Sequence, residues 1–151
     1  MAIYVDADAC AVKEEIYRVA LRVQIPVFVV ANSFLRAPQG PLFHMVVVDA
    51  GPDVADDWIA ERAGPGDVVV TSDVPLADRA LKAGAEALAQ TGRPWTTASI
   101  GQALASRALM EHLRSFGEGS GGPKPFSAQD RSRFLSALDA ALMRARKKTP
   151  S

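Results

Sequence analysis

The sequence has one cysteine and no net charge, and each of these features excludes a class of protein. No disulfide can form within the chain because Cys10 is its single cysteine, a pattern typical of the reducing cytoplasm. The 17 basic and 17 acidic residues cancel, so the composition lacks the strong positive charge of general nucleic-acid binders. Any interaction with nucleic acid must therefore come from a local site.

Long apolar runs are also missing. No stretch of about 18 apolar residues occurs, which excludes a helix that crosses a membrane. The residues from Met1 to Asp6 lack the basic and long apolar regions of a secretory signal. We therefore expect a cytoplasmic protein without a membrane partner.

Apolar runs alternate with helical patterns along the chain, which predicts an α/β fold. Continuous apolar runs predict buried strands at 3–5, 27–31, 45–48 and 68–71, with a weak edge strand at 85–89. Helical spacing and breakers predict helices over 11–23, 54–63, 75–84, 100–115 and 127–145. This alternation favours three layers, with helices flanking a mostly parallel central sheet of about five strands. We expect one domain over residues 1–146 and a disordered basic tail over 147–151.

Two helix starts carry capping signals. Thr97 or Ser99 is a candidate N-cap for the helix over 100–115. Ser127 and Asp130, three residues apart, resemble a capping box at the start of the last helix.

Aspartates follow the predicted strands at the edge where parallel strands bind ligands. Asp6 and Asp8 follow the first strand, Asp73 follows the fourth, and Asp56 and Asp57 open the helix before it. Two carboxylates about 5 Å apart repel by about 3 kcal/mol at an effective dielectric near 20. A converging cluster therefore needs a proton, a basic partner or a metal ion.

A ligand set made of oxygen atoms favours Mg²⁺ or Mn²⁺ over zinc. We expect Asp6, Asp73 and one of the pair Asp56 and Asp57 to be the ligands, and Asp6, Asp8, Asp57 and Asp73 to be the catalytic residues. Such an ion polarises a phosphoryl oxygen and lowers the pKa of a bound water. The plainer interpretation, a turn residue or helix cap, applies most to Asp49 and Asp53.

Polar and basic residues near this edge and in the last helix are candidates for holding a phosphate backbone. These candidates are Lys13, Asn32, Ser72, Lys124, Arg131 and Arg133. The alternative for the last three is a solvated loop followed by an exposed helix face.

Four separated motifs resemble the YaiI/YqxD family of small bacterial proteins. They are Ile3-Tyr-Val-Asp-Ala-Asp-Ala-Cys10, Ala55-Asp-Asp-Trp-Ile-Ala60, Val69-Val-Thr-Ser-Asp73 and Asp130-Arg-Ser-Arg-Phe-Leu135. The resemblance covers about residues 2–142 and implies a PIN-like fold. Ala11 stands where the family usually has proline, a departure that affects the start of the first helix.

PIN-like domains are typically ribonucleases that depend on magnesium or manganese. The resemblance implies that Asp6 and Asp73 match their strand-end aspartates and that Asp56 or Asp57 matches the acidic residue on the intervening helix. Asp8 and Asp78 are further candidates.

We therefore predict a metal-dependent nuclease that hydrolyses RNA with a metal-activated water. One alternative is a non-catalytic PIN-like scaffold that binds RNA or a protein. Another is a phosphatase like the haloacid dehalogenases, with Asp6 as the phosphorylated nucleophile. The order of motifs disfavours this phosphatase, because its acidic pair follows the Ser/Thr strand, whereas Asp56 and Asp57 precede Thr71 and Ser72.

Overall fold

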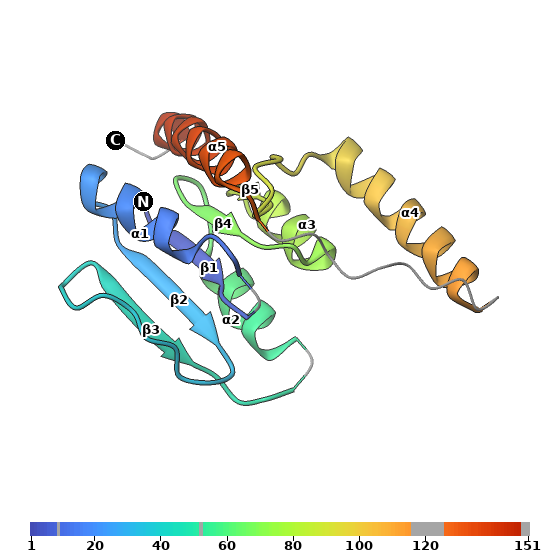
Figure 1. Ribbon diagram of the computed structural model, residues 1–151, viewed down its shortest axis with the longest axis horizontal. Coiled ribbons are helices and arrows are strands. Elements are labelled where there is room, and N and C mark those ends of the chain that lie inside the picture. The colour runs from blue at the N-terminus through green and yellow to red at the C-terminus, as the bar shows by residue number, and fades with distance from the viewer. Residues whose placement is uncertain (9, 52, 116–125, 149–151) are drawn as a thin grey trace.

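The computed structural model describes residues 1–8, 10–51, 53–115 and 126–148, with only the backbone described over 107–115. Five strands form one sheet in the order β3-β2-β1-β4-β5, and all four pairs of neighbours are parallel. The elements in chain order are β1 (Ile3–Asp6), α1 (Lys13–Val23), β2 (Val27–Ala31), β3 (Phe43–Val47), α2 (Val54–Arg62), β4 (Val68–Val70), α3 (Val74–Lys82), β5 (Glu86–Leu88), α4 (Thr97–Ser115) and α5 (Ala128–Lys148). Helices flank the sheet (Figure 1), which confirms the predicted three-layer α/β fold.

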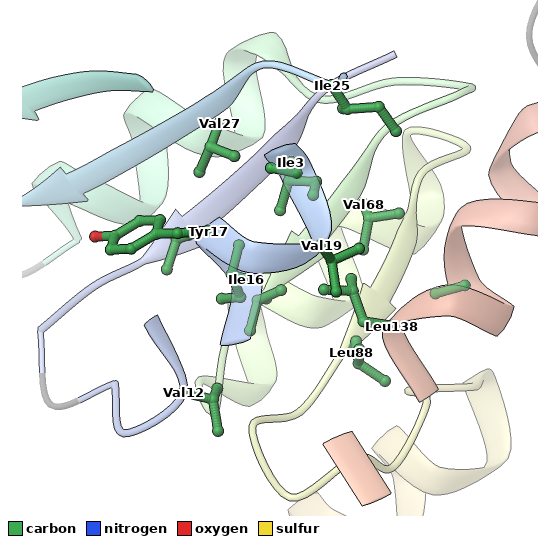
Figure 2. Close-up of a cluster of buried hydrophobic side chains, with 14 of the residues drawn as sticks. Ile3, Val12, Ile16, Tyr17, Val19, Ile25, Val27, Val68, Leu88 and Leu138 are labelled. Atoms are coloured by element: carbon green, nitrogen blue, oxygen red, sulfur yellow. The ribbon is translucent and has the colours of Figure 1, made fainter. Parts of the chain in front are cut away.

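One face of the sheet packs against α1 and α5. Successive side chains of a strand point to opposite faces, so Ile3 and Val5 belong to this side. Both belong to one hydrophobic cluster with Ile16 of α1 and Leu138 of α5, and Figure 2 labels Ile3, Ile16 and Leu138 within it. Each of these four side chains is fully buried, and fully burying such a side chain contributes about 1.5–3 kcal/mol.

The opposite face packs against α2 and α3. Tyr4 faces this side together with Ile59 of α2 and Leu76 of α3. The helix α4 lies outside α3 (Figure 1) and adds Ile100 to the same cluster. The side chain of Asp6 follows the alternation of β1 and should therefore point to the α2 and α3 side.

The predicted cap of α4 is wrong by one to three residues. Thr96 caps this helix: the Ser99 N–H donates to Thr96 Oγ1 at 3.0 Å, and the Thr96 N–H donates to Ser99 Oγ at 2.7 Å. Thr96, Thr97 and Ser99 lie close together in the sequence, and each residue type can cap a helix. The local sequence pattern therefore does not identify the cap. The predicted capping box of α5 is confirmed, with Asp130 N–H to Ser127 Oγ at 3.1 Å and Ser127 N–H to Asp130 Oδ2 at 3.0 Å.

The end of α5 also differs from the prediction. Lys147 and Lys148, assigned above to a disordered tail, continue the helix. Lys148 Nζ lies 3.2 Å from Glu86 Oε1, a carboxylate at the start of β5 that is largely buried. Residues 149–151 and the predicted loop over 117–125 lie outside the described residues. Across the described ranges, no helix is both long and apolar enough to cross a membrane.

Candidate acidic site

The acidic residues gather where the succession of strands changes direction. The chain runs outward from β1 to β2 and β3 on one side, whereas β4 and β5 lie on the other side. Open α/β sheets bind ligands in the crevice at such a point, beyond the carboxyl ends of the strands. A cavity of about 70 Å³ lies there, lined by Asp6, Asp8, Cys10, Val70, Thr71, Ser72 and Gln90.

Thr71 connects the ends of β1 and β4. Its buried hydroxyl donates to Asp6 Oδ2 at 2.8 Å and accepts from the backbone N–H of Asp73 at 2.9 Å. Asp73 in turn caps α3, because its Oδ1 accepts from the N–H of Leu76 at 2.9 Å. A single hydroxyl therefore links the carboxylate of Asp6 to the backbone of Asp73, a residue from a distant part of the chain.

Asp6 is held in an environment that disfavours its charge. Burial is the main cause that raises its pKa, and the charges of Asp73 and Asp8 raise it further. The hydrogen bond from Thr71 lowers this pKa without cancelling the rise. Within the described part of the chain, Asp6 Oδ1 has no hydrogen-bond partner.

The structure separates Asp56 from Asp57. Ile59 is the fully buried residue of α2, and Asp56 lies one turn before it on the same face. Asp57 points outward, with 55% of its side chain exposed, and its Oδ1 lies 2.6 Å from Arg79 Nη1. Asp57, which the sequence predicted as a catalytic residue and a metal ligand, thus forms an exposed ion pair with Arg79. Of the two adjacent aspartates, Asp56 is the one that faces the sheet.

Asp56 has a strongly raised pKa. Its pKa rises to about 6, first because of burial and then because of the charges of Asp73, Asp6 and Asp53. Arg79 opposes this rise. The charges of Asp6, Asp53 and Asp73 therefore act on Asp56, although these residues come from separate elements of the fold.

Asp53 was interpreted as a possible helix cap, and its geometry differs from that of a cap. It precedes α2 with a φ of 67°, and its side chain makes no capping hydrogen bond. A non-glycine residue in this left-handed region is uncommon. Its charge instead contributes to the raised pKa of Asp56.

The predicted residues after β1 and β2 lie close together. The backbone N–H of Asn32, rather than its side chain, donates to Asp8 Oδ2 at 3.3 Å. Ser72 is exposed and lines the acidic cavity, as Asp8 does. Asp78, the further candidate from the family resemblance, pairs with Lys82 at 2.9 Å within α3.

The predicted phosphate-binding cations have different surroundings. Arg131 Nη1 donates to Glu15 Oε1 at 3.0 Å and to the carbonyl of Ala11 at 2.9 Å, so it neutralises a buried carboxylate on α1. Arg133 is exposed, with Asp130 at 3.9 Å. Lys13 is half-buried at the start of α1, and Lys124 lies outside the described residues. Arg131 therefore has a structural partner, whereas Arg133 is open to solvent.

Three residues of the site were missed or undervalued in the sequence. Thr71 was named there beside Ser72 in the Ser/Thr strand of the phosphatase alternative, and Arg79 and Gln90 were not named. Gln90 lines the cavity, and its Oε1 accepts from the N–H of Ala11 at 2.8 Å. For Thr71 a usable signal existed, since it directly follows a buried valine run; Arg79 and Gln90 have no such signal.

The carboxylate oxygens of this cluster are the kind of ligand that magnesium and manganese prefer. Among the described side chains, no group of three or more His, Cys, Asp or Glu residues is placed to hold one ion. Mg²⁺ keeps several waters and often uses one or two carboxylates together with substrate phosphates, so a closed protein shell is not required. Burial, and after it the charges of neighbouring carboxylates, raises the pKa values of Asp6 and Asp56, so the charged forms of both groups are disfavoured without a cation.

The fold and site define a three-layer α/β protein with a carboxylate cluster at the switch point of a parallel sheet. The family model described as "Uncharacterized BCR, YaiI/YqxD family" matches residues 4–144, so the chain belongs to the YaiI/YqxD family, as the motifs predicted. A UPF0178 protein of Caulobacter sp. (strain K31) is 61% identical over 145 residues, which is 96% of each chain. A UPF0178 protein of Bradyrhizobium diazoefficiens is 62% identical over 97% of this chain and 87% of its own. No solved structure matches the chain.

Proposed function

We propose that this protein is a metal-dependent nuclease that hydrolyses phosphodiester bonds in RNA. The observation that carries the proposal is the gathering of carboxylates at the switch point of the sheet. Thr71 binds both Asp6 and the backbone of Asp73 there, and burial, followed by the charges of Asp73, Asp6 and Asp53, raises the pKa of Asp56 to about 6. Above this pH the cluster accumulates negative charge that a divalent cation would neutralise. A structural role for these carboxylates would predict a basic partner for Asp56 at contact distance. Within the described ranges, Asp56 has no such ion pair.

One or two of the carboxylates of Asp6, Asp56 and Asp73 would hold the ion, together with water and a phosphate of the substrate. Thr71 orients Asp6 and Asp73 before any ion binds. One carboxylate oxygen of Asp6 accepts a hydrogen bond from Thr71, and one carboxylate oxygen of Asp73 accepts a hydrogen bond from the N–H of Leu76. When bound, Mg²⁺ or Mn²⁺ would polarise a phosphoryl oxygen and lower the pKa of a water molecule. Asp8 lines the same cavity and would accept a proton from a water near the phosphate.

The size of the cavity supports a polymeric substrate. Pockets that enclose whole small molecules usually measure about 300–1,000 Å³, whereas this cavity measures about 70 Å³. It therefore suits a single charged group such as a phosphate, with the rest of the substrate outside. Ser72 lies exposed at the cavity and can donate a hydrogen bond to a phosphate oxygen.

Cleavage of a fluorescent single-stranded RNA in Mn²⁺ tests this function. We expect Asp6→Asn and Asp56→Asn to lower the rate at least about 100-fold, because removal of a metal ligand lowers metal affinity or activity by at least as much as the 10–100-fold loss typical of its hydrogen-bond partners. Asp57→Asn, the adjacent control, should keep the rate within a few-fold. EDTA should abolish cleavage.

Full activity in Asp56→Asn, or cleavage that persists in EDTA, would reject the proposal. Metal-independent RNA binding by a wild-type protein that never cleaves would favour the scaffold interpretation instead.

A further inference from the structure

A second and larger cavity adjoins the acidic site. It has a volume of about 410 Å³ and is formed by the segment after β5 and by the first half of α4. Ser72 lines both cavities. The two spaces therefore meet at the residue that follows Thr71.

A hydrogen bond links the wall of the larger cavity to the acidic residues. Trp95 lines this cavity, and its indole Nε1–H donates to the backbone carbonyl of Thr71 at 3.1 Å. The hydroxyl of the same threonine donates to Asp6. The position of the indole is thus fixed relative to the carboxylate that we assign to the metal.

The lining has the chemistry of a site for a flat, neutral and polar ring. Trp95 and Pro94 supply apolar surfaces, and Gln102 supplies both a donor and an acceptor. Arg93 is the single charged residue in the described lining, and no carboxylate belongs to it. A lining with one cationic side chain and no carboxylate suits a ligand whose ring is neutral and whose attached group is anionic.

We propose that the cavity beside Trp95 binds one unpaired nucleobase of the RNA whose phosphate lies at the acidic site. This inference rests on the proposed function, and it adds a substrate class, single-stranded RNA. Unstacked bases bind on aromatic side chains and through their hydrogen-bonding edges. A base within a duplex is paired and stacked, and it must leave the helix to enter such a pocket.

Two matched substitutions on α4 test the pocket. Ala103 lines the cavity, whereas Ala105 is exposed on the same helix and is absent from the lining. Ala103→Phe fills the space, and Ala105→Phe makes the same chemical change outside it. Binding of a fluorescein-labelled uridine decamer is measured by anisotropy in EDTA, so that cleavage does not interfere.

We expect Ala103→Phe to weaken binding about 5- to 100-fold, the range that stacking of one base on an aromatic side chain provides. Ala105→Phe should bind within twofold of wild type. A blunt duplex of the same length should bind wild type at least about tenfold more weakly than the single strand.

The chain contains two tryptophans, which provides a second readout. In a Trp58→Phe background, Trp95 is the sole indole, and the decamer should quench its fluorescence. Adding Ala103→Phe should remove this quenching, whereas Ala105→Phe should preserve it. This measurement follows the pocket itself and does not depend on cleavage.

The outcomes separate this inference from the proposed function. Equal binding by the two phenylalanine variants, or no binding of the decamer by wild type, would overturn the nucleobase pocket even if RNA is cleaved in Mn²⁺. Selective weakening by Ala103→Phe in a protein that never cleaves would support the pocket and reject the nuclease.

Discussion

Replacing Asp56 with asparagine should make the folded protein more stable at alkaline pH. The pKa of Asp56 is about 6 in the folded protein, against an ordinary value of 3.8 that applies to the unfolded chain. Between these values the folded state holds a proton that the unfolded state has released, so stability falls as pH rises. The stability that the proton on Asp56 contributes to the folded state is thus fully present below about pH 4 and is lost as pH rises through about 6.

The difference between the two pKa values corresponds to about 3 kcal/mol. Asp56 is partly exposed, and solvent screening reduces this figure. We therefore expect Asp56→Asn to unfold with a free energy about 1–2 kcal/mol higher than wild type at pH 8, and with no gain at pH 4. Asp57→Asn should gain nothing at pH 8, because it removes an exposed ion pair with Arg79.

Urea denaturation followed by circular dichroism at pH 4, 6 and 8 measures these free energies. Adding millimolar Mn²⁺ at pH 8 should stabilise wild type more than Asp56→Asn, because a ligand that binds the folded state raises its stability. An Asp56→Asn protein less stable than wild type at pH 8 would refute the reasoning, since it would show that the carboxylate has a favourable partner.

Two further predictions concern the surroundings of the site. Thr71→Val should lower the free energy of unfolding by about 1–2 kcal/mol, because it removes the hydrogen bonds to Asp6 and from Asp73. It should also raise the pKa of Asp6 and shift the acidic limb of the cleavage pH profile upward. An unchanged profile would contradict this role of Thr71. Arg131→Ala should cost about 2–4 kcal/mol in urea denaturation, because Glu15 is left buried without its partner. Arg133→Ala is the exposed control and should change stability little; equal losses in the two variants would show that the ion pair is not the cause.

Much of the fold can be predicted from the sequence because a local pattern of residues marks each strand. The run Val27–Ala31 is continuous, apolar and bounded by a proline, and β2 has those bounds. The neighbouring strand was predicted at 45–48, whereas β3 is Phe43–Val47. Its start is set by pairing of Phe43 with Val27 in the parallel register, and the choice of partner and register is not a local property.

The site was partly readable for a related reason. Asp6 ends a buried strand, so its proximity to the sheet edge follows from the sequence. The choice between Asp56 and Asp57 depends on which face of α2 turns toward the sheet. The buried Ile59, three residues after Asp56, fixes that face.

Arg131 illustrates the limit of such reasoning. Its partner Glu15 is 116 positions away in the chain, and no spacing rule connects them. A basic residue near a glycine-rich loop predicts a phosphate ligand. The pairing of Arg131 with Glu15 follows only from the packing of α5 on α1.

Anomalous scattering from crystals soaked in Mn²⁺ at pH 8 tests the central claim most directly. The account predicts one or two manganese peaks beside the carboxylate oxygens of Asp6 and Asp56. An absence of manganese there, or a peak bound by Asp57 on the outer face of α2, would contradict the account.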